Sequence, residues 1–252
     1  MKTFVIGDIH GNFKALKEVL QKSEFNYKKD ELIILGDVVD GHMQTRQCVE
    51  ELLKIKHKIF ILGNHDKWFI EHMRRGSTPT IWTSQGGINT LTSYSAEVKS
   101  EGNTTTPAIL DMENFKVPVT HQHFFNTNIP YYIDHRNFAY VHAGFKPDSP
   151  IHEQMIRNRK EAAYNLIWDR TLIAFAKQRP VPFYKHVFVG HSTTQLIGGS
   201  DPNIDNCLEP ITFHNLTCMD TGAGWNGTLS IMNVESGEFW VSKIQKPPEV
   251  TK

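Results

Sequence analysis

The chain has 252 residues, and its 27 Lys and Arg are balanced by 27 Asp and Glu. This balance argues against a cationic face for nucleic acid or an anionic membrane surface, because both partners require an excess of basic residues. No segment reaches the roughly 18 consecutive apolar residues of a membrane span. The length fits one large α/β domain or two small ones, and a small polar substrate is compatible with the composition.

The cysteines predict a reducing compartment. Cys48, Cys207 and Cys218 are odd in number and lack the spacing of a metal site or a disulfide framework. The first residues carry too short an apolar run for a signal peptide. We therefore expect a cytoplasmic protein, and the sequence leaves its oligomeric state open.

The first quarter of the chain predicts a parallel sheet. Short apolar runs at 4–6, 32–35 and 59–62 are typical of strands buried on both faces. Helical patterns lie between them, one beginning after Asn12, a suitable N-cap, and one with an apolar stripe at 49–53. Alternating strands and helices imply parallel strands joined by right-handed crossovers.

The middle of the chain has a different composition. Residues 76–136 are rich in Thr, Ser, Asn and aromatic residues and show no long period, which predicts a capping insertion with a few short helices. Trp82, Phe124 and Phe125 in this segment could form an apolar platform above the site or pack in the core. The strand signal resumes in four later runs, at 138–141, 186–189, 216–219 and 228–234. The final runs favour antiparallel hairpins.

Potential metal ligands follow five of the predicted strands. The first three strands end at Gly7, Gly36 and Gly63, each followed at once by Asp or Asn, and two later strands end at histidine. Because the carboxyl ends of parallel strands meet at one edge of a sheet, these side chains should converge. The converging set is Asp8, His10, Asp37, Asn64, His142 and His191.

This mixed set of oxygen and nitrogen ligands predicts a dinuclear metal site. It suits Mn²⁺, Fe or Zn²⁺ better than Ca²⁺, which prefers oxygen ligands alone. Six ligands are too many for one tetrahedral ion, but they suffice for two ions about 3.5–4 Å apart if one carboxylate bridges them. Asp37 is the simplest bridge. We therefore expect two divalent ions, with Mn²⁺ as the first choice and Fe or Zn²⁺ as alternatives.

These motifs resemble a known signature set. Gly7-Asp8-Ile9-His10-Gly11, Gly36-Asp37-Val38-Val39-Asp40, Gly63-Asn64-His65-Asp66, His142-Ala143-Gly144 and Gly190-His191 are similar to the motifs of the metallo-dependent phosphoprotein phosphatases, within the calcineurin-like superfamily. Features of the smaller bacterial and phage members are also present, and diadenosine tetraphosphatases share part of the pattern. The resemblance implies a four-layer α/β/β/α sandwich, with 1–252 forming a single metallophosphoesterase domain and 76–136 its capping insertion.

The resemblance also implies a role for each site residue. Asp8 and His10 would hold one metal, Asn64, His142 and His191 the other, and Asp37 would bridge them. A hydroxide between the metals would attack phosphorus, and His65, oriented by Asp40, would protonate the leaving alkoxide. Asp220 would hold a metal-ligating histidine in place.

One departure from the family affects phosphate binding. Many relatives carry Arg-Gly where this chain has Gly41-His42, and they use that arginine to bind the phosphate. Arg170 resembles the second phosphate-binding arginine of the family, whose guanidinium suits two phosphoryl oxygens. Arg46 and the Arg74-Arg75 pair are alternative sources of the missing charge.

The function that follows is metal-dependent hydrolysis of a phosphomonoester, first of phosphoserine or phosphothreonine in a protein. The partner would then be a phosphorylated protein or a small phosphoester, with no nucleic acid and no membrane. Two alternatives stay open. One is symmetrical cleavage of diadenosine tetraphosphate or another nucleotide phosphodiester, and the other is a metal- and phosphate-binding protein without turnover.

Overall fold

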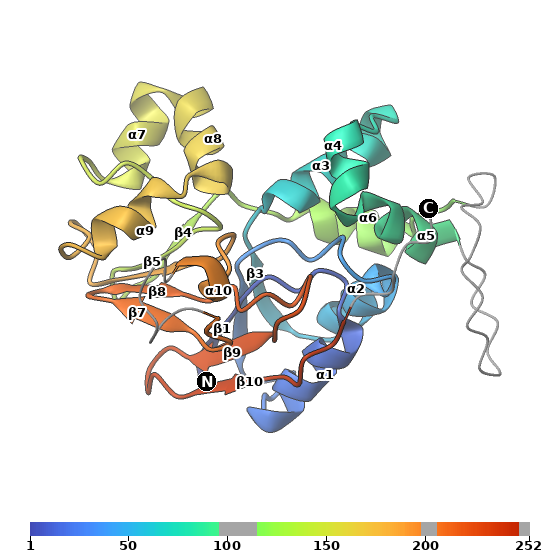
Figure 1. Cartoon of the computed structure of the whole chain (residues 1–252), viewed down its shortest axis with the longest axis horizontal. Helices are drawn as coiled ribbons and strands as arrows, with labels where there is room; N and C mark the ends of the chain where they lie inside the picture. The colour runs from blue at the N-terminus through green and yellow to red at the C-terminus, as the bar shows by residue number, and fades with distance from the viewer. Residues whose placement is uncertain (96–114, 198–205, 247–252) are drawn as a thin grey trace.

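Two mixed sheets form the centre of the molecule (Figure 1). The computed structural model describes residues 1–95, 115–197 and 206–246. Residues 96–114 of the predicted insertion therefore lie outside the described residues. Among the described residues, none of the helices combines the length and the apolarity needed to cross a bilayer.

The first sheet contains the three early strands in parallel. Its order is β10-β9-β1-β2-β3, formed by β10 (Phe239–Val241), β9 (Ser230–Asn233), β1 (Thr3–Ile6), β2 (Glu31–Ile34) and β3 (His57–Phe60). β9 pairs antiparallel with both β1 and β10. The predicted parallel arrangement is confirmed, and the run at 228–234 pairs antiparallel as predicted.

The second sheet also has three parallel strands, but an antiparallel strand lies at each of its edges. Its order is β4-β5-β6-β8-β7, formed by β4 (Tyr132–Ile133), β5 (Phe138–Tyr140), β6 (His186–Val189), β8 (Leu216–Cys218) and β7 (Ile211–Phe213). β5, β6 and β8 are parallel, whereas β4 and β7 pair antiparallel at the edges.

The alternation of side chains along the strands explains the layering. In β1, Phe4 and Ile6 lie in a core shared with helices, whereas Val5 lies in a separate core with Tyr140 and Phe188 of the second sheet. Successive strand residues point to opposite faces, so an unbroken apolar strand packs on a helix layer and on a sheet at once. The predicted α/β/β/α sandwich is confirmed.

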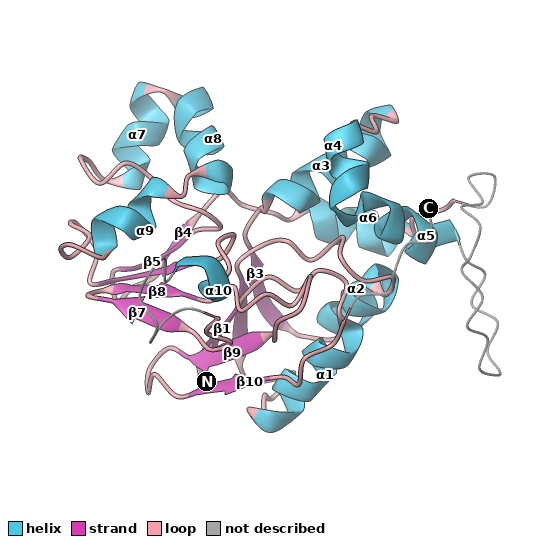
Figure 2. Ribbon diagram, viewed as in Figure 1, coloured by secondary structure: helices cyan, strands magenta, loops and turns pink. Residues whose placement is uncertain are grey.

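Helices cover both outer faces of the sheet pair (Figure 2). On the first sheet lie α1 (Phe13–Lys22), α2 (Thr45–Leu53), α3 (Asn64–Arg75), α4 (Thr80–Trp82), the π-helical turn η1 (Thr83–Gly87), α5 (Ile88–Ser95) and α6 (Val119–Asn126). On the second lie α7 (Ile151–Arg157), α8 (Arg159–Trp168) and α9 (Thr171–Ala176), and α10 (Thr194–Ile197) follows β6. Asn12 caps α1 as predicted, because its side chain accepts a hydrogen bond from Ala15 N.

The aromatic residues of the predicted insertion lie in the core. Phe124 and Phe125 are buried, and Phe124 stacks on Phe60 at the end of β3 with a ring separation of 4.8 Å. Trp82 is fully buried beside Phe69. The core alternative therefore holds for these three side chains, and the platform alternative does not.

Candidate metal centre

The strand ends turn sharply into the site. His10, Asp37, Asp40 and His191 have left-handed backbone conformations, with φ of 50°, 46°, 70° and 63°. Such conformations cost a non-glycine residue about 1–3 kcal/mol each and persist where surrounding contacts enforce them. Here the loops bind one another: His10 N donates to Asp37 O at 2.8 Å, and His191 N donates to Asp8 Oδ2 at 3.0 Å.

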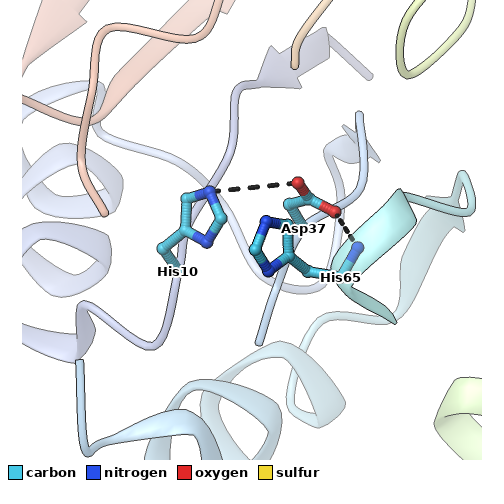
Figure 3. Close-up of side chains that lie close together, drawn as sticks. All are labelled: His10, Asp37 and His65. Carbon is cyan, nitrogen blue, oxygen red and sulfur yellow. Dashed lines mark hydrogen bonds and ion pairs between the residues drawn. The ribbon is translucent and has the colours of Figure 1, made fainter. Parts of the chain in front are cut away.

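Asp37 lies at the centre of the converging side chains. Its Oδ2 is 3.4 Å from His142 Nε2 and 3.9 Å from His10 Nε2, and its Oδ1 accepts a hydrogen bond from His65 N at 2.9 Å (Figure 3). Within the part of the chain that the structure describes, two groups of buried side chains could each hold a metal ion, His10 with Asp37 and His65, and Asp37 with His142 and His191. Asp37 belongs to both groups, as a bridging ligand would.

The histidine tautomers leave lone pairs facing the centre. His10 Nδ1 donates to Val39 O at 3.0 Å, and His142 Nδ1 donates to Leu35 O at 2.8 Å. Burial lowers the pKa of His10 to about 4 and that of His142 to about 3, so both rings are neutral at pH 7. Their Nε2 atoms are therefore acceptors, and His142 Nε2 lies 2.9 Å from Asn64 Oδ1, another acceptor. A shared cation would stabilise this arrangement.

Two buried atoms also lack a partner. Asp8 Oδ1 and His191 Nε2 have no hydrogen-bond partner among the described residues, although both side chains line the cleft. Burial, with the charges of Asp220 and Asp37, raises the pKa of Asp8 well above its usual range. Buried charges are normally paired or bound to metal, so these atoms fit divalent cations. Asp8 lies outside the group that contains His10, its predicted partner.

Asp40 and His65 form a buried pair beside this centre. Asp40 Oδ2 lies 2.6 Å from His65 Nδ1, and Asp40 is fully buried. Burial alone would lower the pKa of His65, but the carboxylates of Asp37, Asp40 and Asp66 outweigh it and raise that pKa to about 9. Burial raises the pKa of Asp40, although its hydrogen bonds oppose the shift. The geometry predicted for an oriented histidine is present.

Asp66 is a buried site residue to which the sequence analysis gave no role. Its Oδ1 accepts from Val38 N at 2.9 Å and its Oδ2 from Gly63 N at 3.2 Å, so it joins the loops after β2 and β3. Burial and the charge of Asp37 raise its pKa to about 8. An acidic residue at the third position of a helix that follows a strand is a capping pattern, and that pattern could have revealed it.

Among the described residues, two basic side chains, Arg170 and Lys177, line the cleft. Arg170 lines the cleft, and its Nη1 donates to His191 O at 2.8 Å and to Ser192 Oγ at 2.7 Å. Lys177 also lines the cleft, and its Nζ donates to Ile197 O. Arg46 instead pairs with Glu50 on the surface, at 3.2 Å.

Gly41 and Asp220 have structural partners of their own. Gly41 has φ of 68°, and a Cβ there would lie 2.9 Å from His10 Cβ, so the loop does not admit an arginine without moving.

The carboxylate of Asp220 accepts from Gly222 N at 3.0 Å, a contact within its own turn. Burial, with the charge of Asp37, raises the pKa of Asp220 to about 6.

The metal centre opens into a cleft of about 1090 Å³. Beyond the predicted ligands, its lining mixes polar side chains with an apolar set from the second half of the chain: Trp168, Ile173, Ala174, Leu196, Ile197 and Trp225. Gln85 of η1 also lines it. The cleft is therefore much larger than a phosphate group and has room for the rest of a substrate.

Comparison with known proteins assigns the fold to a family. A family model described as calcineurin-like phosphoesterase matches residues 1–215. The chain belongs to the calcineurin-like phosphoesterases. The family uses divalent metals, in agreement with the two groups of ligands around Asp37, and its members are hydrolases.

Relatives of this phosphoesterase have two different names. A symmetrical bis(5'-nucleosyl)-tetraphosphatase of Pseudomonas fluorescens is 22% identical, over 100% of this chain and 98% of its own. Serine/threonine-protein phosphatase 1 of Salmonella typhimurium is 23% identical, over 92% and 91%. Among solved structures, a putative diadenosine tetraphosphatase superposes with a TM-score of 0.62 at 17% identity, covering 96% of this chain and 92% of its own. That structural likeness establishes the fold.

Proposed function

We propose that this phosphoesterase is a dinuclear metal-dependent phosphomonoester hydrolase that acts on phosphoserine or phosphothreonine in proteins. The observation that carries the proposal is the position of Asp37 in both ligand groups. His65 belongs to the first group by position, but we assign it to proton donation because its Nδ1 is bound to Asp40. The full-length similarity to a serine/threonine-protein phosphatase supports the choice of substrate.

In this proposal the six predicted ligands keep their roles. Asp8, His10, Asn64, His142 and His191 are metal ligands, and Asp37 is shared. Two bound divalent ions, Mn²⁺ in the first instance, would lower the pKa of a water molecule and polarise the phosphoryl oxygens. Arg170 would bind the phosphate through the guanidinium nitrogens that do not contact the backbone of His191.

His65 would protonate the leaving oxygen. Its Nδ1 is bound to Asp40, which leaves Nε2 as the ring nitrogen able to donate. Bound cations would offset the negative charge of Asp37 and so lower the pKa of His65 from about 9 toward neutrality. A general acid works best when its pKa lies near the working pH.

Three further assignments belong to the same proposal. Residues 76–136 would act as the cap of a single domain, and Gln85 of this segment already lines the cleft. The protein would be cytoplasmic, which agrees with the free state of Cys48, Cys207 and Cys218. Asp220 would act on the metal ligands through its negative charge, since its carboxylate accepts from Gly222 N rather than from a histidine.

The second candidate function is symmetrical cleavage of diadenosine tetraphosphate. The relative that matches the whole chain bears that name, and the cleft is lined by the aromatic rings of Trp168 and Trp225, on which a nucleobase could stack. A turnover assay with Mn²⁺ separates the candidates by comparing a phosphoserine peptide, diadenosine tetraphosphate and bis(p-nitrophenyl) phosphate.

We expect the highest kcat/KM on the phosphopeptide. A clear preference for diadenosine tetraphosphate would favour the second candidate. Bound Mn²⁺ without turnover of any substrate would instead indicate a binding protein. The variant His65→Asn should lose phosphopeptide turnover, whereas Asp148→Asn, on the exposed surface, should not.

A further inference from the structure

The segment from Trp82 to Thr90 closes around the carboxylate of Asp40. Asp40 Oδ2 accepts from His65 Nδ1 at 2.6 Å and from Trp82 Nε1 at 2.8 Å, and Oδ1 accepts from Thr90 Oγ1 at 2.7 Å. The Thr90 hydroxyl also accepts from Asp40 N at 2.8 Å. This hydroxyl therefore binds both the backbone and the side chain of Asp40, which selects one rotamer of that side chain.

The backbone geometry of the segment makes these contacts possible. The π-helical turn η1 contains a kink at Gln85 and Gly86, and Gly86 has φ of 95°. A Cβ on Gly86 would lie 2.5 Å from Gly41 N, so the two loops touch through their backbones. Asn89 Nδ2 donates to Gly41 O at 2.5 Å and ties α5 to the residue after Asp40.

We propose that Trp82 and Thr90 are positioning residues for the Asp40–His65 pair. Fixing both carboxylate oxygens of Asp40 fixes the plane of the carboxylate, and the carboxylate in turn sets the orientation of the His65 ring. The orientation of His65 then depends on Trp82 and Thr90, which lie 42 and 50 residues after Asp40 in the chain. The inference rests on the proposed function only where it concerns proton donation to the leaving group.

Four substitutions distinguish a positioning role of Trp82 and Thr90 from a purely structural one. Trp82 packs against Phe69 and His72, so Trp82→Phe keeps an aromatic ring in the core and removes the N–H donor. Thr90→Val keeps the shape of the side chain and removes the hydroxyl, whereas Thr90→Ser restores the hydroxyl. Thr92→Val is the matched control, since Thr92 is also buried on α5 and has no hydrogen bond to Asp40.

The first test compares leaving groups at saturating substrate with Mn²⁺. In Thr90→Val and Trp82→Phe, kcat for an alkyl phosphate should fall by about 10- to 100-fold, part of the 10²–10⁴ that general acid catalysis supplies. The kcat for p-nitrophenyl phosphate, whose leaving group needs no proton, should change little, and KM should be unchanged for both. Thr90→Ser and Thr92→Val should resemble the wild type. Equal losses on both substrates, with no rescue by Thr90→Ser, would overturn the proposal.

The second test does not depend on activity. In the metal-free, ¹⁵N-labelled protein, the short His65 Nδ1–H···Oδ2 hydrogen bond should give a downfield imidazole proton signal that disappears in His65→Asn. We expect this signal to weaken or shift in Thr90→Val and Trp82→Phe and to remain in Thr92→Val. An unchanged signal in both variants would overturn the positioning role. If the wild type hydrolyses no phosphoester but the signal responds as expected, the proposed function fails while the positioning role stands.

Discussion

Replacing Asp37 by Asn should have opposite effects on the metal-free and the metal-bound protein. The amide oxygen of Asn can still accept from His65 N, as Asp37 Oδ1 does at 2.9 Å. The amide nitrogen would replace Oδ2, which faces the lone pairs of His142 Nε2 at 3.4 Å and His10 Nε2 at 3.9 Å. A donor would then face two acceptors, and one buried negative charge would be gone.

The size of both effects can be worked out. Asp37 repels Asp8, Asp66 and Asp220, whose pKa values it raises, but it also attracts His65, whose pKa it raises as well. Its removal therefore relieves three repulsions among buried carboxylates and loses one attraction. At an effective dielectric constant near 20, we expect the metal-free variant to gain about 1–2 kcal/mol in free energy of unfolding. Each metal bound at 100 times its Kd adds about 2.7 kcal/mol to the wild type. With about 2–4 °C per kcal/mol for a chain of this size, two metals should raise its Tm by about 10–20 °C.

Scanning calorimetry in EDTA and in excess Mn²⁺ measures both effects. Asp37→Asn should melt above the wild type in EDTA and should lose most of the increase that Mn²⁺ gives to the wild type. Asp148→Asn, on the exposed surface, should behave as the wild type in both conditions. If Asp37→Asn kept the full Mn²⁺-dependent increase, Asp37 would not be the shared ligand. A lower Tm in EDTA would refute the argument from facing acceptors.

Further outcomes follow from the same site. His10→Ala should leave about one Mn²⁺ per chain by metal analysis, because His10 is a ligand of one metal ion. Asp37→Asn should leave less, because Asp37 is shared by both metal ions. Arg170→Ala should lower kcat/KM by about 10- to 150-fold, or about 1.5–3 kcal/mol, with metal content unchanged; an unaltered kcat/KM would exclude it as the phosphate ligand. Gly41→Arg should not improve KM and should reduce Mn²⁺ content, since the new Cβ would press on His10; tighter substrate binding with full metal content would contradict this.

The strand ends could be predicted because they depend on local pattern. Apolar runs of three or four residues, each followed by glycine and a polar ligand, predict the ends of β1, β2 and β3 to within two residues and indicate what lies there. Five of the six predicted ligands line one cleft, and the Nε2 of the sixth, His142, lies 3.4 Å from Asp37 Oδ2. β4, β7 and β10 were not predicted, because strands of two or three residues have too few positions to show a period.

The contacts around Asp40 show why the hydrogen bonds between distant segments of the site could not be predicted from the sequence. The sequence around Trp82 indicates an aromatic residue with two structural alternatives, and nothing in it indicates a hydrogen bond to a carboxylate 42 residues earlier. That bond exists because the π-helical turn at Gln85 and Gly86 redirects the chain onto the loop after β2. Such a kink is a property of tertiary packing rather than of residue type. Gly41 is similar, since its left-handed conformation follows from its contact with His10.

The site also connects the two sheets. His142 follows β5 in the second sheet, yet its Nδ1 donates to Leu35 O beyond β2 in the first, and His191 N, after β6, donates to Asp8 after β1. The second ligand group therefore combines Asp37 from the first sheet with His142 and His191 from the second. A cation bound there would attract ligands from both sheets and offset the cost of burying their charges, so metal binding should stabilise the docking of one sheet on the other. The left-handed backbone of His191 fits this view, because its N–H donates to Asp8 across the two sheets and a cation that strengthens this contact would help to hold the strained conformation.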